Sequence, residues 1–175
     1  MCIRDSGKVT KEELNRQRYL YPLEAVGAGD STLAKAYERD ALTMIPTKSK
    51  LMPHAREVLE YLSGKYNLYI LSNGFKELQS HKMRSSGIDE YFKKVVLSDD
   101  IGILKPWPEI FHFALSTTQS ELNNSLMIGD SWENDIVGAA GVGMHQVFYN
   151  LSGRTDLPFA PTYQITDLKD LFNFL

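Results

Sequence analysis

The sequence contains a single cysteine, Cys2, among its 175 residues. One thiol can form neither a disulfide within the chain nor a zinc site of the cysteine type, so both are excluded. No apolar run approaches the roughly 20 residues that a membrane-spanning helix needs, and the first residues do not have the pattern of a signal peptide. We therefore expect no membrane partner and a cytoplasmic location.

The chain also lacks a strong excess of either charge. Its formal net charge is −3 and its pI is about 5.8, so it has no basic footprint for a nucleic acid polymer. Hydrophobic residues make up 43% and charged residues 23% of the sequence, which is ordinary for a globular protein. The composition predicts a folded domain with a hydrophobic core and says nothing of its oligomeric state.

Three segments differ in their patterns. Residues 1–6 follow no periodicity, and we interpret them as a short non-native segment left by sequence assembly. Residues 7–50 carry two helical patterns that are separated by Gly27 and Gly29 and end before Pro46. A third helix, with Pro53 in its first turn, is predicted to end at Gly64. This helix opens the third segment, which begins at residue 51, and the sequence pattern changes after it.

Short apolar strands alternate with helices after residue 64. Such an alternation is typical of βαβ units, so we predict an α/β fold: a Rossmann-like parallel sheet with helices on both faces. A further helix is predicted at the C-terminus. The predicted strands are 66–71, 94–97, 126–128, 146–149 and 163–165, and the helices between them are 75–85, 109–116 and 135–140.

The first strand that carries a polar end is the run Leu-Tyr-Ile-Leu-Ser-Asn-Gly-Phe, residues 68–75. Ligands bind beyond the carboxyl ends of parallel strands. There Ser72 offers a hydroxyl, and Asn73 and Gly74 offer amides at the start of the next helix, which suits an anion such as phosphate. The alternative is that these three residues only end a strand and cap a helix.

A lysine follows the next strand, in the segment Gly-Ile-Leu-Lys-Pro. Pro106 restricts the chain directly after Lys105, so the amine is expected to have a fixed direction. A cation there can neutralise a phosphoryl group and a nucleophilic carboxylate. Taken alone, the pair is equally compatible with an ordinary surface position.

The segment Leu-Met-Ile-Gly-Asp-Ser-Trp-Glu-Asn-Asp-Ile, residues 126–136, places two acids after a strand. Asp130 follows the strand and Asp135 begins a helix, so both can converge on one hard cation. Magnesium favours such a site, with one or two carboxylates, waters and phosphate oxygens. The alternative is that both acids are helix caps. Trp107 and Trp132 flank these segments and are candidates to border a nucleobase.

The segments LSNGF, GILKP and IGDSWENDI, in this order, resemble motifs two, three and four of the haloacid dehalogenase (HAD) superfamily. The likeness is greatest to its pyrimidine 5′-nucleotidase branch. It implies that residues 7–50 are part of a helical cap and that 51–175 are the α/β core. It also implies a magnesium-dependent phosphomonoester hydrolase whose substrate is a small phosphorylated metabolite, a nucleoside 5′-monophosphate.

In this family an aspartate attacks phosphorus and a second aspartate acts as acid and base. The resemblance implies that Ser72, Asn73 and Gly74 bind phosphoryl oxygens and that Lys105 steadies the nucleophile. It further implies that Asp130 binds Mg²⁺ and that Asp135 completes or orients the metal shell. Ser72, Asn73, Lys105 and Asp130 are thus the catalytic candidates.

Motif one, an apolar strand that ends in Asp-x-Asp-x-Thr, occurs nowhere in the 175 residues. Neither Asp5 nor Asp30 follows such a strand. We expect an N-terminally truncated hydrolase core without its first strand and nucleophile, with negligible phosphatase activity and unpaired strand edges.

Three alternatives remain. A haloacid dehalogenase shares the scaffold but uses no Mg²⁺, and the paired acids favour the phosphatase. A receiver domain also ends a strand in Lys-Pro, but its acidic cluster precedes the lysine. The third alternative is a homologue that binds phosphate without catalysis.

Overall fold

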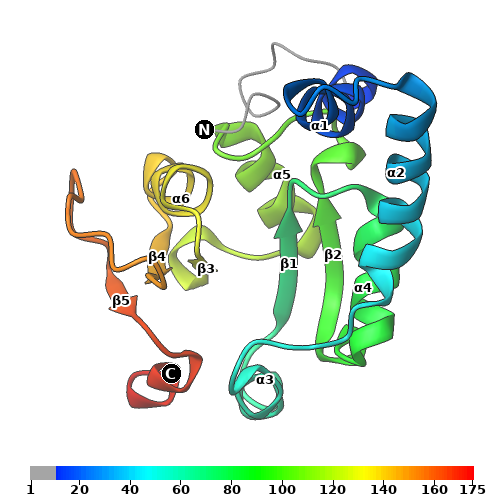
Figure 1. Cartoon of the computed structure of the whole chain (residues 1–175). Helices are drawn as coiled ribbons and strands as arrows, with labels where there is room; N and C mark the ends of the chain where they lie inside the picture. The colour runs from blue at the N-terminus through cyan, green and yellow to red at the C-terminus, as the bar shows by residue number, and fades with distance from the viewer. Residues whose placement is uncertain (1–10) are drawn as a thin grey trace.

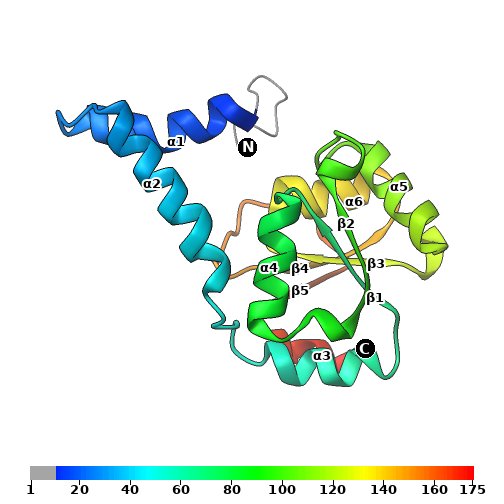
Figure 2. The ribbon, with the colours of Figure 1, turned by 90° about the vertical axis from the view of Figure 1, so that its right-hand side faces the viewer.

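The computed structural model describes residues 11–175, with the side chains of all of these except Lys11, Glu12, Leu14, Asn15 and Glu77. The segment interpreted as non-native, residues 1–6, lies outside the described range. The described chain consists of a helical hairpin and an α/β body (Figures 1 and 2). No described helix combines the length and the apolar character that crossing a bilayer would require.

The hairpin contains α1 (Lys11–Ala25) and α2 (Ser31–Met44), followed by the 3-10 turn η2 (Ile45–Thr47). Asp30 caps α2, because its carboxylate accepts a hydrogen bond from the backbone N–H of Thr32 at 2.7 Å. Gly27 provides the positive φ of 74° in the turn between the helices. Both predicted helices are confirmed, and the hairpin extends away from the body (Figure 2). The boundary between residues 7–50 and the body stays a prediction.

The body alternates strands and helices as the sequence predicts. All strand pairs are parallel, so the predicted α/β fold is confirmed. In chain order the elements are α3 (Ala55–Ser63), β1 (Leu68–Ser72), α4 (Lys76–Ser86), η3 (Asp89–Tyr91), β2 (Phe92–Leu97), η4 (Ser98–Asp100), α5 (Pro108–Thr118), η5 (Leu122–Asn124), β3 (Leu126–Gly129), η6 (Trp132–Val137), α6 (Gly138–Gly141), β4 (His145–Tyr149), β5 (Tyr163–Ile165) and η7 (Leu168–Asn173).

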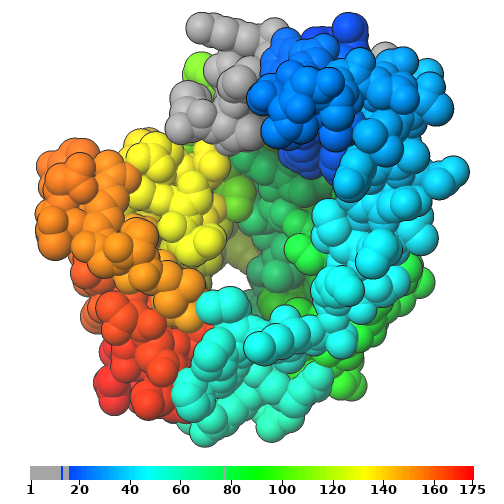
Figure 3. Space-filling model, viewed as in Figure 1, coloured from blue at the N-terminus to red at the C-terminus, as the bar shows by residue number. Residues whose placement is uncertain are grey.

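The strands form two parallel groups. β1 pairs with β2, with Ile70 opposite Val95, and β3–β4–β5 form the second group, with Ile128 opposite Val147. Among residues 11–175 no strand joins β1 to β3. Each of these two strands therefore has one edge without a hydrogen-bonded neighbour in the described chain. Figure 3 shows an opening through the molecule between the part that carries β1 (green) and the segment after β3 (yellow).

Two hydrophobic clusters hold the strand groups together, one on each face. On one face α3 and η7 contribute Val58, Leu62 and Leu171, and both Leu68 of β1 and Ile128 of β3 pack against this cluster. On the other face α5 and α6 contribute Ile110, Phe111 and Ala139 to the second cluster, which also contains Met144 directly before β4; Leu71 of β1 and Met127 of β3 pack against it. Helices thus cover both faces, as predicted.

Three details differ from the sequence-based expectation. Pro53 precedes the third helix, which begins at Ala55 after His54 adopts a left-handed conformation. The predicted helix 135–140 is a π-helical turn, η6, followed by the short α6. The C-terminal helix is the 3-10 segment η7, capped by Asp167. Helical periodicity does not distinguish these variants, because they differ in backbone hydrogen bonding and not in residue pattern.

We predict that Gly138→Ala destabilises the protein by about 1–3 kcal/mol, the usual effect of overpacking. A Cβ at Gly138 would lie 2.6 Å from the ring of Phe111 and 3.0 Å from Cα of Pro106. A Cβ at Gly141, in the same helix, would meet nothing within 4 Å. Gly141→Ala is therefore the control, with stability unchanged or slightly raised. Urea unfolding measures both; equal stability of the two variants would contradict the packing described here.

Candidate active site

The predicted site residues gather at the carboxyl ends of β1 and β3. Ser72 is the last residue of β1, and Asp130 follows Gly129, the last residue of β3. The polar ends of these two strands lie near each other, because Lys105 donates to the carbonyl of Leu71 in β1 and to Asp135, which follows β3. The lysine loop between β2 and α5 reaches these ends and places Lys105 beside both strands.

The hydroxyl of Ser72 is held by two donors. Its oxygen accepts hydrogen bonds from the backbone N–H of Gly74 at 3.0 Å and from the side-chain amide of Gln79 at 2.6 Å. A serine hydroxyl has two acceptor positions and one donor. Since both acceptor positions are filled, the Ser72 proton is the group left to bond with another molecule. The hydroxyl is thus prepared to donate to an oxygen such as that of a phosphoryl group.

The side chain of Asn73 fixes the lysine loop. Its amide nitrogen donates to the carbonyl of Lys105 at 3.0 Å, and its oxygen accepts from the N–H of Lys105 at 2.8 Å. These two bonds hold both backbone polar groups of one residue, which sets the direction of that residue's side chain. The expectation of a directed lysine is thus supported by hydrogen bonds from Asn73 that the sequence did not predict.

The ammonium group of Lys105 is buried and connects the two strand groups. It donates to the carbonyl of Leu71 in β1 at 2.7 Å and to Oδ1 of Asp135 at 2.6 Å. Lys105 and Asp135 are 8% and 4% exposed, so this is a buried ion pair. An ammonium has three protons, and these two bonds leave one proton for a ligand.

The second oxygen of Asp135 accepts a hydrogen bond from the N–H of Ser131 at 3.0 Å. Both oxygens are therefore engaged by protein groups. The carboxylate also occupies the space where a side chain on Gly129 would lie, so a glycine is required at the end of β3. Asp135 holds Lys105 and the turn after β3 at the same time, which suits the orienting role considered for it.

Asp130 differs from Asp135 in its environment. It is exposed, and no hydrogen bond or ion pair of its carboxylate occurs within the described part of the chain. No group of three histidine, cysteine, aspartate or glutamate side chains capable of holding a metal is present among the described residues. Magnesium needs only one or two carboxylates when waters and phosphate oxygens complete its shell. The free carboxylate of Asp130 therefore fits a shared magnesium site.

Glu133, three residues after Asp130, takes part in a surface ion pair. Arg154 donates to Glu133 at 2.7 Å and to Asp156 at 3.2 Å. The hydrogen bond from Arg154 lowers the pKa of Glu133 below its ordinary value of 4.5, and the same bond raises the pKa of Arg154. This pair joins η6 to the loop after β4.

The two tryptophans have different environments. Trp132 is 3% exposed and packs edge-on against Phe148 and obliquely against Phe159. The expectation that Trp132 borders a nucleobase is therefore wrong, because its ring is used in the core. Trp107 is 53% exposed and lines a small hollow with Ile103 and Leu104, so it stays a candidate.

A family model described as haloacid dehalogenase-like hydrolase matches residues 8–143. The chain belongs to this hydrolase family. The predicted resemblance is thus confirmed, and the three polar segments that carry it are the ones that meet at the strand ends.

Relatives of this HAD hydrolase cover most of its length. HAD-hydrolase YfnB of Bacillus subtilis (strain 168) is 29% identical over 175 residues, or 98% of this chain and 73% of that protein. Pyrimidine 5′-nucleotidase YjjG of Escherichia coli (strain K12) is 28% identical over 172 residues, or 97% of this chain and 75% of the relative.

Solved structures confirm the architecture. The crystal structure of YfnB bound to magnesium has a TM-score of 0.88 and 28% identity, covering 98% of this chain and 74% of that one. A 2-haloacid dehalogenase from Pseudomonas syringae pv. Tomato DC3000 has a TM-score of 0.71 and 27% identity, covering 91% and 69%. The fold therefore accommodates proteins that are named for different reactions.

Sequence reasoning missed three groups that shape this HAD hydrolase site: the Gln79 amide, the Leu71 carbonyl and the Ser131 N–H. The two backbone groups carry no residue-specific signal. Gln79 lies seven residues after Ser72 and reaches it only because α4 turns back toward the strand end. No local pattern distinguishes it from other polar residues of that helix.

We predict that Lys105→Met lowers the free energy of unfolding by about 3–5 kcal/mol, because Asp135 would remain buried without its cation. The double variant Lys105→Met/Asp135→Asn should lose less than the sum of the two single changes. The exposed Lys93→Met is the control. Chemical denaturation of wild type, Lys105→Met, Asp135→Asn and the double variant gives the coupling energy, and additive effects would refute the buried pair.

A second prediction concerns pH. The pKa of Glu133 is lowered in the folded state, so its contribution to stability is present above pH 4.5 and is lost as the pH falls through the lowered value. Thermal unfolding of wild type and Glu133→Gln should therefore differ at pH 7, and the difference should shrink as the pH falls below 4.5. A difference that stays constant over this range would argue against the ion pair.

Proposed function

We propose that this HAD hydrolase chain forms the phosphate-binding part of a magnesium-dependent phosphomonoesterase. We further propose that its substrate is a small phosphorylated metabolite, a nucleoside 5′-monophosphate. The observation that carries the proposal is the convergence of two unused donors and one free carboxylate at the strand ends. The donors are the Ser72 hydroxyl and the third proton of Lys105, and the carboxylate is that of Asp130.

Each group has a role that follows from its remaining bonding capacity. The Ser72 hydroxyl donates to one phosphoryl oxygen, and the Gly74 turn shapes the backbone around it. Lys105 places its positive charge where a phosphoryl group gains negative charge during transfer, which is an effective form of electrostatic stabilisation. Asn73 and Asp135 hold that lysine from its backbone and from its amine.

Asp130 is the residue that would hold Mg²⁺. A bound magnesium ion would supply positive charge that orients the phosphate and polarises its oxygens. Asp135 would orient the site indirectly, through Lys105 and the turn after β3, since its two oxygens are engaged by Lys105 and Ser131. The magnesium in the YfnB crystal structure and the pyrimidine nucleotidase activity in the name of YjjG support this proposal for a related chain.

A nucleophile is still needed for turnover. The sequence pattern Asp-x-Asp-x-Thr does not occur in the 175 residues, and the Asp135 carboxylate is buried in its ion pair. We therefore expect the 175-residue chain to bind a nucleoside monophosphate without hydrolysing it. Loss of a nucleophile and of acid–base assistance removes the covalent route as well as a factor of about 10²–10⁴ in rate.

A dehalogenase is the second candidate, because a 2-haloacid dehalogenase has the same architecture. Its chemistry at carbon needs no metal. The free, exposed Asp130 favours the metal-dependent phosphatase, since a carboxylate without a protein partner suits a cation. A homologue that binds phosphate without catalysis would share the binding groups and differ only in the missing nucleophile.

The test is calorimetric titration of the purified chain with cytidine 5′-monophosphate, with and without Mg²⁺. We expect Mg²⁺ to strengthen binding and Asp130→Asn to abolish that gain. Asp89→Asn is the matched control, because Asp89 is exposed and precedes β2 at the opposite end of the strand. Binding that is indifferent to Mg²⁺ would contradict the metal role, and chelator-resistant release of halide from a haloacid would favour the dehalogenase.

A further inference from the structure

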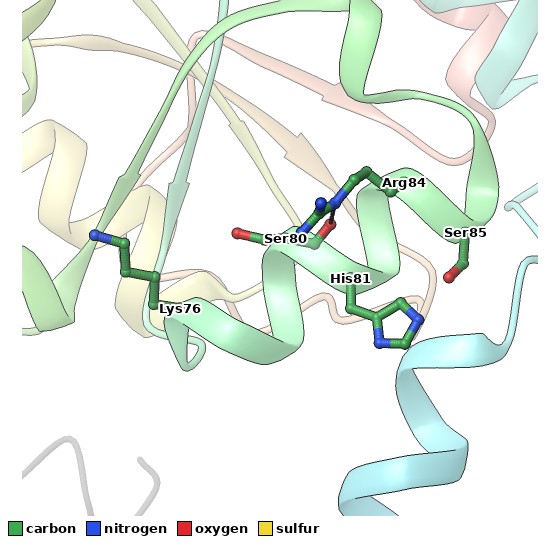
Figure 4. Close-up of a pocket in the computed structure, with 5 residues that line it drawn as sticks. All are labelled: Lys76, Ser80, His81, Arg84 and Ser85. Atoms are coloured by element: carbon green, nitrogen blue, oxygen red, sulfur yellow. Dashed lines mark hydrogen bonds between the residues drawn. The ribbon is translucent and has the colours of Figure 1, made fainter.

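An open hollow of about 900 Å³ lies along one side of α4, from its first turn to its last. It is lined by polar side chains of this one helix, which Figure 4 shows as sticks. The helix contacts η2, at the base of the hairpin, and the His81 ring points toward the neighbouring helical ribbon in Figure 4. The lining residues are Lys76, Ser80, His81, Arg84 and Ser85.

Two spacings place these side chains together. Lys76, Ser80 and Arg84 are four residues apart, and so are His81 and Ser85, so they form two adjacent rows on one helical face. Lys82 belongs to the same helix but not to the lining. The face is therefore a defined surface of hydrogen-bond donors, and it contains no large apolar side chain.

Most of these donors have no acid partner. The Nε of Arg84 donates to the carbonyl of Ser80 at 3.2 Å, which folds the guanidinium back over the helix. No ion pair of Arg84 or His81 occurs within the part of the chain that the structure describes. The hydroxyls of Ser80 and Ser85 likewise have no hydrogen bond there. Only Lys76 has an acid nearby, Asp100 at 3.7 Å.

Such a set of groups matches an anion with several acceptor oxygens. The planar guanidinium presents parallel N–H groups that fit a phosphate in a two-point contact, and hydroxyl and imidazole N–H groups can donate to its remaining oxygens. Every lining residue carries a polar or charged group. The chemistry therefore favours a phosphoryl group over an uncharged ligand.

The Arg84 end of the hollow is separate from the strand-end site. Eight residues of helix separate Lys76 from Arg84, which corresponds to about 12 Å along the axis. A phosphate bound by Ser72 and Lys105 cannot also contact Arg84 across that distance. We propose that Arg84, Ser80 and His81 form a second anion site that binds a phosphoryl group, either of free phosphate or of a phosphorylated metabolite.

The site is tested by NMR titration of the ¹⁵N-labelled full chain with inorganic phosphate. Binding should shift the amides of residues 80–85 in a saturable manner. Arg84→Gln should weaken this binding at least about tenfold, as expected for loss of a charge-assisted hydrogen bond. Lys82→Gln, which removes the same charge from the same helix outside the hollow, should change it less than about twofold.

Two additional arms complete the test. His81→Gln is a milder change at an exposed residue, and it should weaken phosphate binding even if Arg84→Gln fails to fold. Cytidine 5′-monophosphate replaces phosphate in a parallel titration: tighter binding identifies a metabolite as ligand, and equal binding identifies the phosphate group alone. Either result supports the second site.

The proposal is overturned if Arg84→Gln and Lys82→Gln weaken binding equally, because only overall charge would then matter. It is also overturned if the shifts occur at residues 72–74 alone. Asp130→Asn separates the two sites: it should leave phosphate binding at α4 unchanged. The second anion site can therefore be confirmed or rejected independently of the proposed phosphatase function.

Discussion

The buried ion pair between Lys105 and Asp135 is the interaction on which the rest of the structure depends. The lysine amine donates to the Leu71 carbonyl in one strand group and to Asp135, which follows the other. No backbone hydrogen bond joins β1 to β3 in the described residues, so this amine provides a polar connection between the two groups. The hydrophobic clusters on the two faces provide an apolar connection between the same two groups.

The same interaction determines the geometry of the candidate active site. Asn73 fixes the backbone of Lys105, and Asp135 fixes its amine while also binding the turn after β3. Removing two charges from water costs free energy, and this cost is offset only where good hydrogen bonds satisfy both charged groups. Here hydrogen bonds satisfy both buried charges and leave one lysine proton and the Ser72 hydroxyl proton available. The network that connects the two strand groups therefore also positions the groups of the candidate site.

Much of the fold was predictable from local patterns. Alternating apolar strands and helices predict the parallel α/β architecture, and the segments around Ser72, Lys105 and Asp130 predict the edge at which the candidate site lies. The limits of prediction are also local in origin. Periodicity places a helix after β3 but does not distinguish the π-helical turn η6, and an aromatic residue near a motif does not reveal that Trp132 is packed in the core.

The partners of the site residues could not be predicted for a different reason. Lys105 and Asp135 are 30 residues apart, and their pairing depends on how two strand groups are packed. The sequence makes Asp135 a candidate for a metal shell or for an orienting group, and only the tertiary arrangement shows that its oxygens bind Lys105 and Ser131. No sequence pattern marks Gln79, because its hydrogen bond to Ser72 depends on the direction of α4.

Native-state hydrogen exchange at the amides of β1, β2, β3 and β4 tests the central claim most directly. If the buried pair and the shared clusters unite the two strand groups, protected amides in both groups should exchange through one opening with a common free energy. Two separate opening free energies in the wild-type chain, one for β1–β2 and another for β3–β4, would contradict this account.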